Sequence, residues 1–301
     1  MLPVLLSIGS FKIYSYGIFM ALAFLVGSFV VFRKAKEEAF DEGKIFDGIF
    51  TTTLFGLVGA RAYFILLHFD QFGFNPLKWL WLTRYAGLCF HGGLLGGALG
   101  LFLFTKREKW DFWQAADIAV FGLALGQVIG KIGCFLNGCG YGQPTNFFLG
   151  VKFLGLAERR HPTQIYEAVL VFFIYYFLLR LERKYRLFEW YKGKKDKAAP
   201  GFLSLVYLIF YNLARIFLEN LRGDSLYWMG IKTAQLVSGT ILIFALIVLY
   251  YRSGRGLSED KRLLVDNCSL LFDQVKYKIK TIGRKARKRV MRRVKVGKDI
   301  K

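Results

Sequence analysis

Residues 13–32 read IYSYGIFMALAFLVGSFVVF, and the next four are Arg33-Lys34-Ala35-Lys36. An uncharged stretch of this length can cross the roughly 30 Å hydrocarbon core of a bilayer as one helix. A cleavable signal peptide has its positive charges before the apolar region, whereas here they follow it. The stretch therefore predicts a retained first membrane span with its N-terminal end outside the cytoplasm.

Similar stretches recur along the chain, which is 54% hydrophobic, above the roughly 45–50% that is usual for soluble domains. The seven expected spans are 13–32, 46–68, 88–105, 115–138, 163–180, 201–221 and 232–251. We therefore predict an all-α, multi-pass membrane protein. Its transmembrane domain is expected over residues 1–251, and a basic, amphipathic cytoplasmic tail over residues 252–301.

The charge of the connecting segments predicts the orientation of these spans. Segments 33–44, 106–109 and 180–197 together hold 15 lysines and arginines, and the tail holds 17 more, against 8 in the segments of the other side. Cytoplasmic loops carry the excess of Lys and Arg. The N-terminus is thus expected outside and the C-terminus inside, and all seven spans alternate without conflict.

Three cations fall inside the expected spans: Arg61, Lys131 and Arg215. Each costs about 2.5–3.5 kcal/mol at the centre of a membrane helix, so each needs a partner or a purpose. In the sixth span a polar stripe has spacings of four, four and three residues, formed by Tyr211, Arg215, Glu219 and Arg222. A purely structural interpretation, in which Arg215 and Glu219 neutralise each other, stays open.

The third span begins His91-Gly92-Gly93-Leu94-Leu95-Gly96-Gly97. Glycines four residues apart line a groove in which another helix can approach closely, so we expect a packing role for them. His91 lies near the outer end of this span. It is either a functional histidine or one that simply bonds a carbonyl group.

The fourth span ends in the glycine-rich stretch Gly130-Lys131-Ile132-Gly133-Cys134-Phe135-Leu136-Asn137-Gly138-Cys139-Gly140-Tyr141-Gly142. This stretch would be a poor helix in water, and irregular backbone at that depth is tolerated only against protein or a wet cavity. The alternative is an ordinary exit turn at Asn137-Gly138. The fifth span begins His161-Pro162-Thr163-Gln164-Ile165-Tyr166-Glu167, with Pro162 suited to a first helical residue and Glu167 in need of a cationic or hydrogen-bonded partner.

These polar positions converge on one depth of the bilayer. At 1.5 Å per residue, Lys131 and Arg215 lie about 9–10 Å below the outer ends of their helices, and Tyr16, His91, His161 and Glu167 lie at or above that level. An outward-facing polar chamber with two buried cations would suit a lipid phosphate, which the arginine fork can bind through two hydrogen bonds.

At these residues the sequence resembles the prolipoprotein diacylglyceryl transferase family, bacterial enzymes that attach a diacylglyceryl group to the lipobox cysteine of preprolipoproteins. The similarity extends over about residues 1–251, through Tyr14–Gly17, Gly59–Arg61, 91–97, 130–142, 161–167, Arg215–Arg222 and Gln235. The resemblance implies phosphatidylglycerol as donor, glycerol phosphate as by-product, and a location in the bacterial inner membrane.

The resemblance also implies roles for single residues. His91 is a candidate base, and Tyr16 a site residue near the reacting glyceryl group. Tyr211, Arg215 and Glu219 match site residues of a later helix, and Arg222 matches a nearby arginine. Asn137 and Gly142 belong to the signature stretch. His161 and Glu167 are expected beside the phospholipid.

One position departs from the family pattern, because Gly130-Lys131 replaces the family's Gly-Arg. We expect Lys131 to bind the phosphate in its place. The departure leaves open a paralogue that uses another lipid donor or acceptor. A lipid-binding or transport protein is a further alternative, but the paired broken helices in two related halves that many transporters show are not evident here. The expected chemistry, removal of a thiol proton and stabilisation of a phosphate leaving group, needs no metal or cofactor.

The tail combines an apolar stripe with a basic run. Apolar residues recur three or four apart at Leu264, Cys268, Leu271, Val275, Ile279 and Ile282, and residues 276–301 hold 13 lysines and arginines against the single acid Asp299. This pattern favours docking on anionic lipid of the cytoplasmic leaflet. A solvated tail is the alternative, and specific nucleic-acid binding is not expected.

Overall fold

The computed structural model describes residues 2–8, 11–80, 87–183, 200–223, 227–228 and 230–252. Its contacts divide the chain into a compact unit, Met1–Leu249, and a second unit, Tyr250–Lys301. Of the second unit only Tyr250–Arg252 is described, so the predicted lipid-docking stripe of the tail lies outside the described residues.

The first unit begins with an antiparallel hairpin of β1 (Val4–Ile8) and β2 (Phe11–Tyr14), which leads directly into α1 (Ser15–Glu37). After a short turn α2 (Glu42–Leu67) returns, and Asp41 caps it by accepting a hydrogen bond from the Lys44 amide at 3.0 Å. Two short helices, α3 (Phe69–Phe72) and α4 (Pro76–Leu80), follow before α5 (Phe90–Glu108). A short turn then leads into α6 (Phe112–Asn137).

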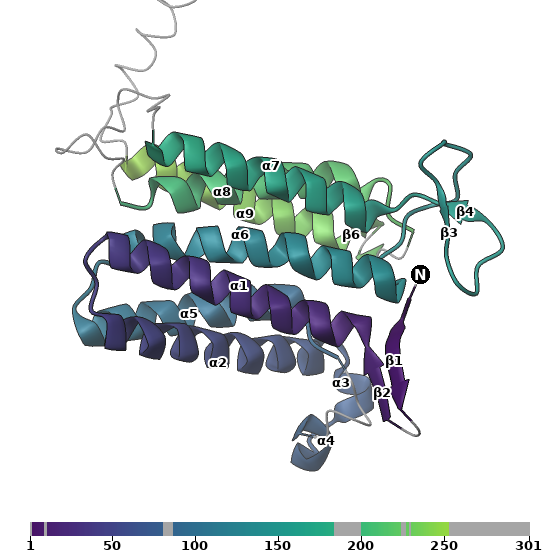
Figure 1. Cartoon of the computed structure of the whole chain (residues 1–301), viewed down its shortest axis with the longest axis horizontal. Helices are drawn as coiled ribbons and strands as arrows, with labels where there is room; N and C mark the ends of the chain where they lie inside the picture. The colour runs from purple at the N-terminus through teal and green to yellow at the C-terminus, as the bar shows by residue number, and fades with distance from the viewer. Residues whose placement is uncertain are drawn as a thin grey trace, which may run out of the picture. The chain divides into compact units, whose positions relative to one another are not determined.

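Glycine faces bring two helix pairs together, as predicted for the glycines after His91. A Cβ atom on Gly59 of α2 would lie 2.5 Å from the Gly92 carbonyl oxygen and 2.8 Å from the Gly96 Cα atom of α5. In the same way, a Cβ atom on Gly27 of α1 would lie 2.9 Å from the Gly122 carbonyl oxygen of α6. Small residues therefore permit backbone-to-backbone contact, which is how membrane helices gain packing energy. Figure 1 shows both pairs.

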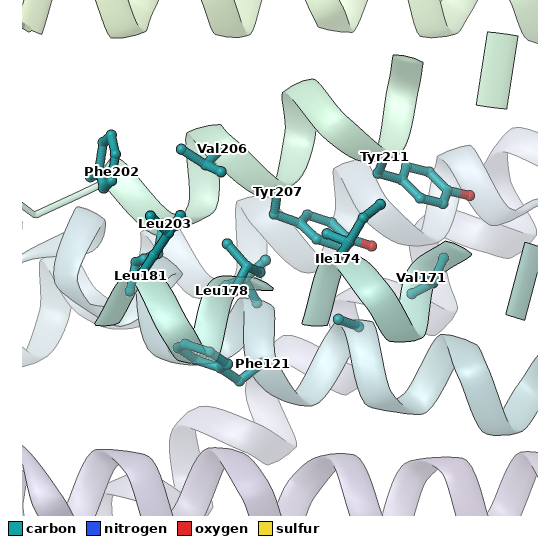
Figure 2. Close-up of a cluster of buried hydrophobic side chains, with 12 residues drawn as sticks. Phe121, Val171, Ile174, Leu178, Leu181, Phe202, Leu203, Val206, Tyr207 and Tyr211 are labelled. Carbon is teal, nitrogen blue, oxygen red and sulfur yellow. The ribbon is translucent and has the colours of Figure 1, made fainter. Parts of the chain in front are cut away.

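The best-buried core lies between α6 (Phe112–Asn137), α7 (Thr163–Arg183) and α8 (Phe202–Glu219). In Figure 2, Phe121 of α6 faces Leu178 and Leu181 of α7, with Leu203 and Val206 of α8 above them. Asp117 of α6 caps α8, since its two carboxylate oxygens accept from the Gly201 and Ser204 amides at 2.8 and 2.7 Å. This cap and core fix the position of α8, which carries the predicted polar stripe.

The last described helix is α9 (Thr233–Arg252), preceded by the two-residue strands β5 (Tyr227–Trp228) and β6 (Ile231–Lys232). Gln235 of α9 joins it to α8 by donating to the Ile216 carbonyl at 3.2 Å and to Asn220 Oδ1 at 2.9 Å.

Six of these helices are long and apolar enough to cross a membrane: α1, α2, α6, α7, α8 and α9. The structure is thus that of a mostly helical, multi-pass membrane protein. The segment expected as the third span is helical, as α5, but it is not among the six. Its five glycines, together with His91 and the basic Lys106 and Arg107, lower its hydropathy. The seventh span and the orientation of the bundle stay predictions.

The glycine-rich end of α6 differs from the expectation of a poor helix. The helix continues through Gly130 and Gly133 to Asn137 and ends at Gly138, whose φ of 80° requires a left-handed conformation. The glycines do not break it because α1 lies against this face, and a Cβ atom on Gly133 would meet Phe19 Cβ at 2.6 Å. The structure instead has the alternative, an exit turn at Asn137-Gly138.

Candidate functional site

The site lies where α6 ends, α7 begins and α8 ends, at the end of the bundle that carries the β hairpins (Figure 1). The segment that follows Gly138, residues 139–143, crosses these three helix ends, and we call it the strap. In the strap, the Gly142 amide donates to the His161 carbonyl and the Gln143 amide to the Leu221 carbonyl, both at 2.8 Å. The backbone therefore ties the signature stretch to α7 and α8. The hairpin of β3 (Val151–Lys152) and β4 (Arg159–Arg160) extends from the same strap.

Glu167 of α7 is the centre of the site. Its side chain is buried, and one carboxylate oxygen, Oε2, lies 2.7 Å from Lys131 Nζ and 3.1 Å from Arg215 Nη1. The other oxygen, Oε1, accepts a hydrogen bond from the Tyr211 hydroxyl at 3.2 Å. One carboxylate from α7 thus joins a cation from α6 to a cation and a hydroxyl from α8.

Glu219 supplies a second buried carboxylate on the other side of Arg215. Its Oε2 atom lies 2.9 Å from Arg215 Nη2 and 3.8 Å from Arg222 Nη1. The intrahelical pairing of Arg215 with Glu219, which the spacing of the stripe predicted, is present. Arg215 is nevertheless shared between two carboxylates, so its guanidinium is fixed from both sides.

The five charged side chains carry three positive and two negative charges, which leaves one positive charge in excess. Their side chains are not equally buried: those of Glu167 and Glu219 are 6% and 2% exposed, whereas those of Lys131 and Arg222 are 27% and 25% exposed. The acids therefore lie deep and two of the cations lie at the surface of the site. A cluster arranged in this way can accept one more anion without burying an uncompensated negative charge.

A cavity of about 200 Å³ opens beside these cations. Its walls come from the ends of α6, α7 and α8 and from the strap, and they are formed by Lys131, Cys134, Cys139, Gly140, Thr163, Gln164, Glu167, Arg215, Leu218 and Arg222. The wall is mixed: Lys131, Arg215 and Arg222 are cationic, Glu167 is anionic, and the other residues are polar, small or apolar. Such a cavity suits an anionic group joined to an apolar one.

Thr163 and Gln164 were not predicted as site residues, although they lie in the 161–167 motif. Thr163 Oγ1 donates to the Gly140 carbonyl and Gln164 Nε2 to the Cys139 carbonyl, each at 2.7 Å. The sequence did contain a signal for Gln164 as a site residue. It lies three residues before Glu167, so the two side chains share one helix face. Both residues hold the strap against the first turn of α7.

The remaining predicted residues surround the cavity without lining it. Asn137 is the last residue of α6, and Gly142 forms a bridge with Arg222. A Cβ atom on Gly142 would lie 2.6 Å from His161 Cβ, so only glycine fits there. The Nδ1 atom of His161 lies 3.4 Å from the Tyr166 hydroxyl.

His91 and Tyr16 approach the site from α5 and α1. The adjacent Phe90 contacts the Tyr211 ring, with centroids 6.4 Å apart, and His91 is within electrostatic range of Arg215 and Glu219. Tyr16 is 39% exposed at the first turn of α1, near Cys134 and Cys139. The structure therefore brings both residues to the same end of the bundle as the charged cluster.

The structure gives Lys131 a partner that the sequence analysis did not identify. Lys131 was expected to bind the phosphate. Its Nζ atom lies 2.7 Å from Glu167 Oε2, so Glu167 is its counter-ion within the protein. The sequence did not show this pairing because the two residues lie on different helices. Any phosphate would add to an existing ion pair.

Arg61, the third cation within the predicted spans, has a different role. Its Nε atom donates to the Trp79 carbonyl at 2.8 Å and its Nη1 atom to the Gly87 carbonyl at 3.1 Å. The guanidinium also lies over the Phe72 ring, 5.2 Å from the centroid. Arg61 thus ties α2 to the backbone at Trp79 and Gly87 and is not part of the charged cluster around Glu167.

Comparison with known proteins gives concordant matches over most of the chain. The family model described as prolipoprotein diacylglyceryl transferase matches residues 3–251. The phosphatidylglycerol–prolipoprotein diacylglyceryl transferase of Clostridium tetani is 32% identical over 254 residues, which cover 82% of this chain and 96% of the relative. Phosphatidylglycerol–prolipoprotein diacylglyceryl transferase 1 of Clostridium perfringens is 34% identical over 273 residues, with coverages of 88% and 99%. The similarly named protein of Synechococcus sp. (strain CC9902) is 31% identical, with coverages of 84% and 94%.

Proposed function

The chain belongs to the prolipoprotein diacylglyceryl transferase family, and from that premise we propose that the cavity beside Lys131 and Arg215 is its active site. The protein is an enzyme that transfers a diacylglyceryl group from phosphatidylglycerol to prolipoproteins. The acceptor atom in this proposal is the thiol sulfur of the lipobox cysteine.

One observation supports this location above others: the charged cluster borders a cavity and carries an excess positive charge. The phosphodiester of phosphatidylglycerol is an anion, and the departing glycerol phosphate gains negative charge as its bond to carbon breaks. Fixed cations stabilise charge that develops during a reaction without reorganising. Arg215, held by Glu167 and Glu219 at 3.1 and 2.9 Å, is fixed in this sense, and Lys131 and Arg222 lie nearer the opening.

The chemical step follows from these positions. The sulfur attacks the glyceryl carbon bonded to the phosphate oxygen, a thioether bond forms, and the carbon–oxygen bond breaks. Glycerol phosphate leaves with that electron pair. The thiol, with an ordinary pKa of about 8.5, must first lose its proton. We propose that His91, which approaches the charged cluster from α5, accepts this proton. We place Tyr16 beside the reacting glyceryl group. Asn137, Gly142 and His161 shape the strap over the phospholipid, and Tyr211 holds Glu167.

We place the protein in the bacterial inner membrane with seven spans. The helix α5 is less apolar than the six helices that meet the length and hydropathy of a span. It nevertheless packs along α2 through its glycines, so it runs beside a helix that can cross the membrane. The distribution of Lys and Arg supports an outer N-terminus and a cytoplasmic C-terminus. The cavity then opens towards the outer leaflet, where a secreted lipobox could reach it.

The proposal is tested by incubating the purified protein with radiolabelled phosphatidylglycerol and a lipobox peptide. We expect a labelled thioether peptide and an equal amount of glycerol phosphate. A peptide with serine in place of the lipobox cysteine is the matched control. Wild-type protein that transfers from another phospholipid but not from phosphatidylglycerol would contradict the donor. Transfer that survives Arg215→Met would contradict the site.

A further inference from the structure

Two cysteines lie in the wall of the cavity, and the proposed reaction does not use them. Cys134 lies in the last turn of α6 and Cys139 directly follows its cap; both are partly exposed and line the cavity. Cys89, the other cysteine in the described part of the chain, precedes α5 and does not line this cavity. A pair of thiols beside a cationic cluster is a chemical feature that needs its own explanation.

The end of α6 holds the two side chains against each other. The Cys139 amide donates to the Cys134 carbonyl at 3.1 Å, and the Gly138 amide donates to the Phe135 carbonyl at 3.2 Å. With Gly138 in the left-handed conformation, these two bonds define the Schellman motif, in which the side chains at the positions of Cys134 and Cys139 commonly contact each other. The Cys139 Sγ atom lies 3.5 Å from the Cys134 carbonyl oxygen, on the same side of the turn.

The surroundings make Cys139 the more reactive thiol of the pair. A hydrogen bond from the Cys134 thiol lowers the pKa of the Cys139 thiol, and the nearby Lys131 cation acts in the same direction, whereas burial opposes them. A thiolate, and not a thiol, attacks disulfides, and access to solvent decides which thiolates react. Cys139 therefore fits the attacking residue, and Cys134 the resolving one.

We propose that Cys134 and Cys139 form a reversible dithiol–disulfide site in the cavity wall, which reacts with small disulfides and stops diacylglyceryl transfer when oxidised. The Cys139 thiolate attacks one sulfur of the small disulfide, whose sulfur–sulfur bond breaks and releases one thiol after protonation. The Cys134 sulfur then loses its proton and attacks Cys139, which releases the second thiol. Two protein thiols are oxidised, and one small disulfide is reduced to two thiols.

Oxidation would affect the cavity through the strap. A disulfide is shorter than a thiol–thiol contact, so bond formation draws Cys139 towards α6. The Cys139 and Gly140 carbonyls accept hydrogen bonds from Gln164 and Thr163 at 2.7 Å. The displacement therefore reaches the first turn of α7, one turn before Glu167, which holds Lys131 and Arg215. The formation of the bond stands on the helix geometry, whereas its effect on transfer rests on the proposed function.

The experiment uses the full chain with Cys89→Ser and Cys268→Ser, so that only the paired thiols remain. The protein is treated with bis(2-hydroxyethyl) disulfide, its free thiols are alkylated, and it is then analysed by mass spectrometry and for transfer. We expect a bridged peptide linking Cys134 and Cys139, transfer that falls in proportion to the bridged fraction, and recovery with dithiothreitol.

Matched variants in the same background separate the two thiols. With Cys134→Ser, a mixed disulfide should accumulate on Cys139; with Cys139→Ser, the reagent should leave both the remaining thiol and that variant's own transfer rate unchanged. Thiols that stay fully alkylated after treatment would overturn the dithiol site. A bridge that forms without loss of transfer would overturn the coupling to the cavity. Absence of transfer in the untreated protein would count against the proposed function alone, because bridge formation is read independently.

Discussion

Replacing Glu167 by glutamine tests whether the shared carboxylate holds the site together. Glutamine keeps the shape of the side chain and an oxygen for hydrogen bonding, but it removes the negative charge that lies 2.7 Å from Lys131 Nζ and 3.1 Å from Arg215 Nη1. The excess of one positive charge in the cluster becomes two. Breaking a buried ion pair by removing one partner costs about 3–5 kcal/mol. Lys131 is 27% exposed, which screens part of its charge, so we expect a loss in unfolding free energy of about 3 kcal/mol, at the low end of that range.

A double-mutant cycle with Lys131→Met isolates the pair. Lys131→Met alone leaves the cluster neutral, and the double variant restores the excess of one positive charge. We therefore expect the double variant to be more stable than the sum of the single losses predicts, with a coupling energy of about 1–3 kcal/mol for groups in direct contact.

The assay is unfolding in mixed micelles by sodium dodecyl sulfate, with and without phosphatidylglycerol. The anionic lipid should stabilise Glu167→Gln more than it stabilises the wild type, because it supplies the missing negative charge. Tyr207→Phe is a matched control, since Tyr207 bonds Gln127 in the same core but carries no charge. A coupling energy near zero, together with equal lipid stabilisation of Glu167→Gln and wild type, would refute the role of Glu167 as the shared counter-ion.

Three further predictions concern other parts of the chain. His91→Gln should lower transfer at least about tenfold, because a positioned base typically contributes about 10²–10⁴-fold; near-normal transfer by a correctly inserted variant would return His91 to a packing role. Lys131→Arg should keep or raise transfer from phosphatidylglycerol, since it preserves the charge and adds a bidentate fork, while Lys131→Met should abolish it; a lower rate for Lys131→Arg on the native donor would indicate a site tuned to another head group. A peptide of residues 260–301 should bind anionic vesicles at about 1 kcal/mol per basic residue near the surface, and equal binding to neutral vesicles at moderate salt would contradict electrostatic docking.

Several features depend on local pattern and could be predicted from the sequence alone. Predominantly apolar runs of about 20 residues predicted the spans, because the thickness of the bilayer sets the length of a crossing helix. The four-residue spacing of Gly92 and Gly96 predicted a close helix contact, and the structure places Gly59 of α2 against both. The spacing of Arg215 and Glu219 likewise predicted their ion pair, since residues four apart lie on one face of a helix.

Which groups meet across helices depends on how the whole bundle packs. Glu167 and Arg215 are 48 residues apart in sequence, and neither their spacing nor their types indicated that one carboxylate would bind both Lys131 and Arg215. The same holds for Arg61, whose carbonyl partners lie in the segment between α3 and α5. A buried charge pairs with whichever partner the packing places within reach. Leaving the charge unpaired in a medium of low dielectric costs more free energy than a change of side-chain rotamer. That packing is set by glycine faces and by the core between α6, α7 and α8, which are properties of the assembled bundle.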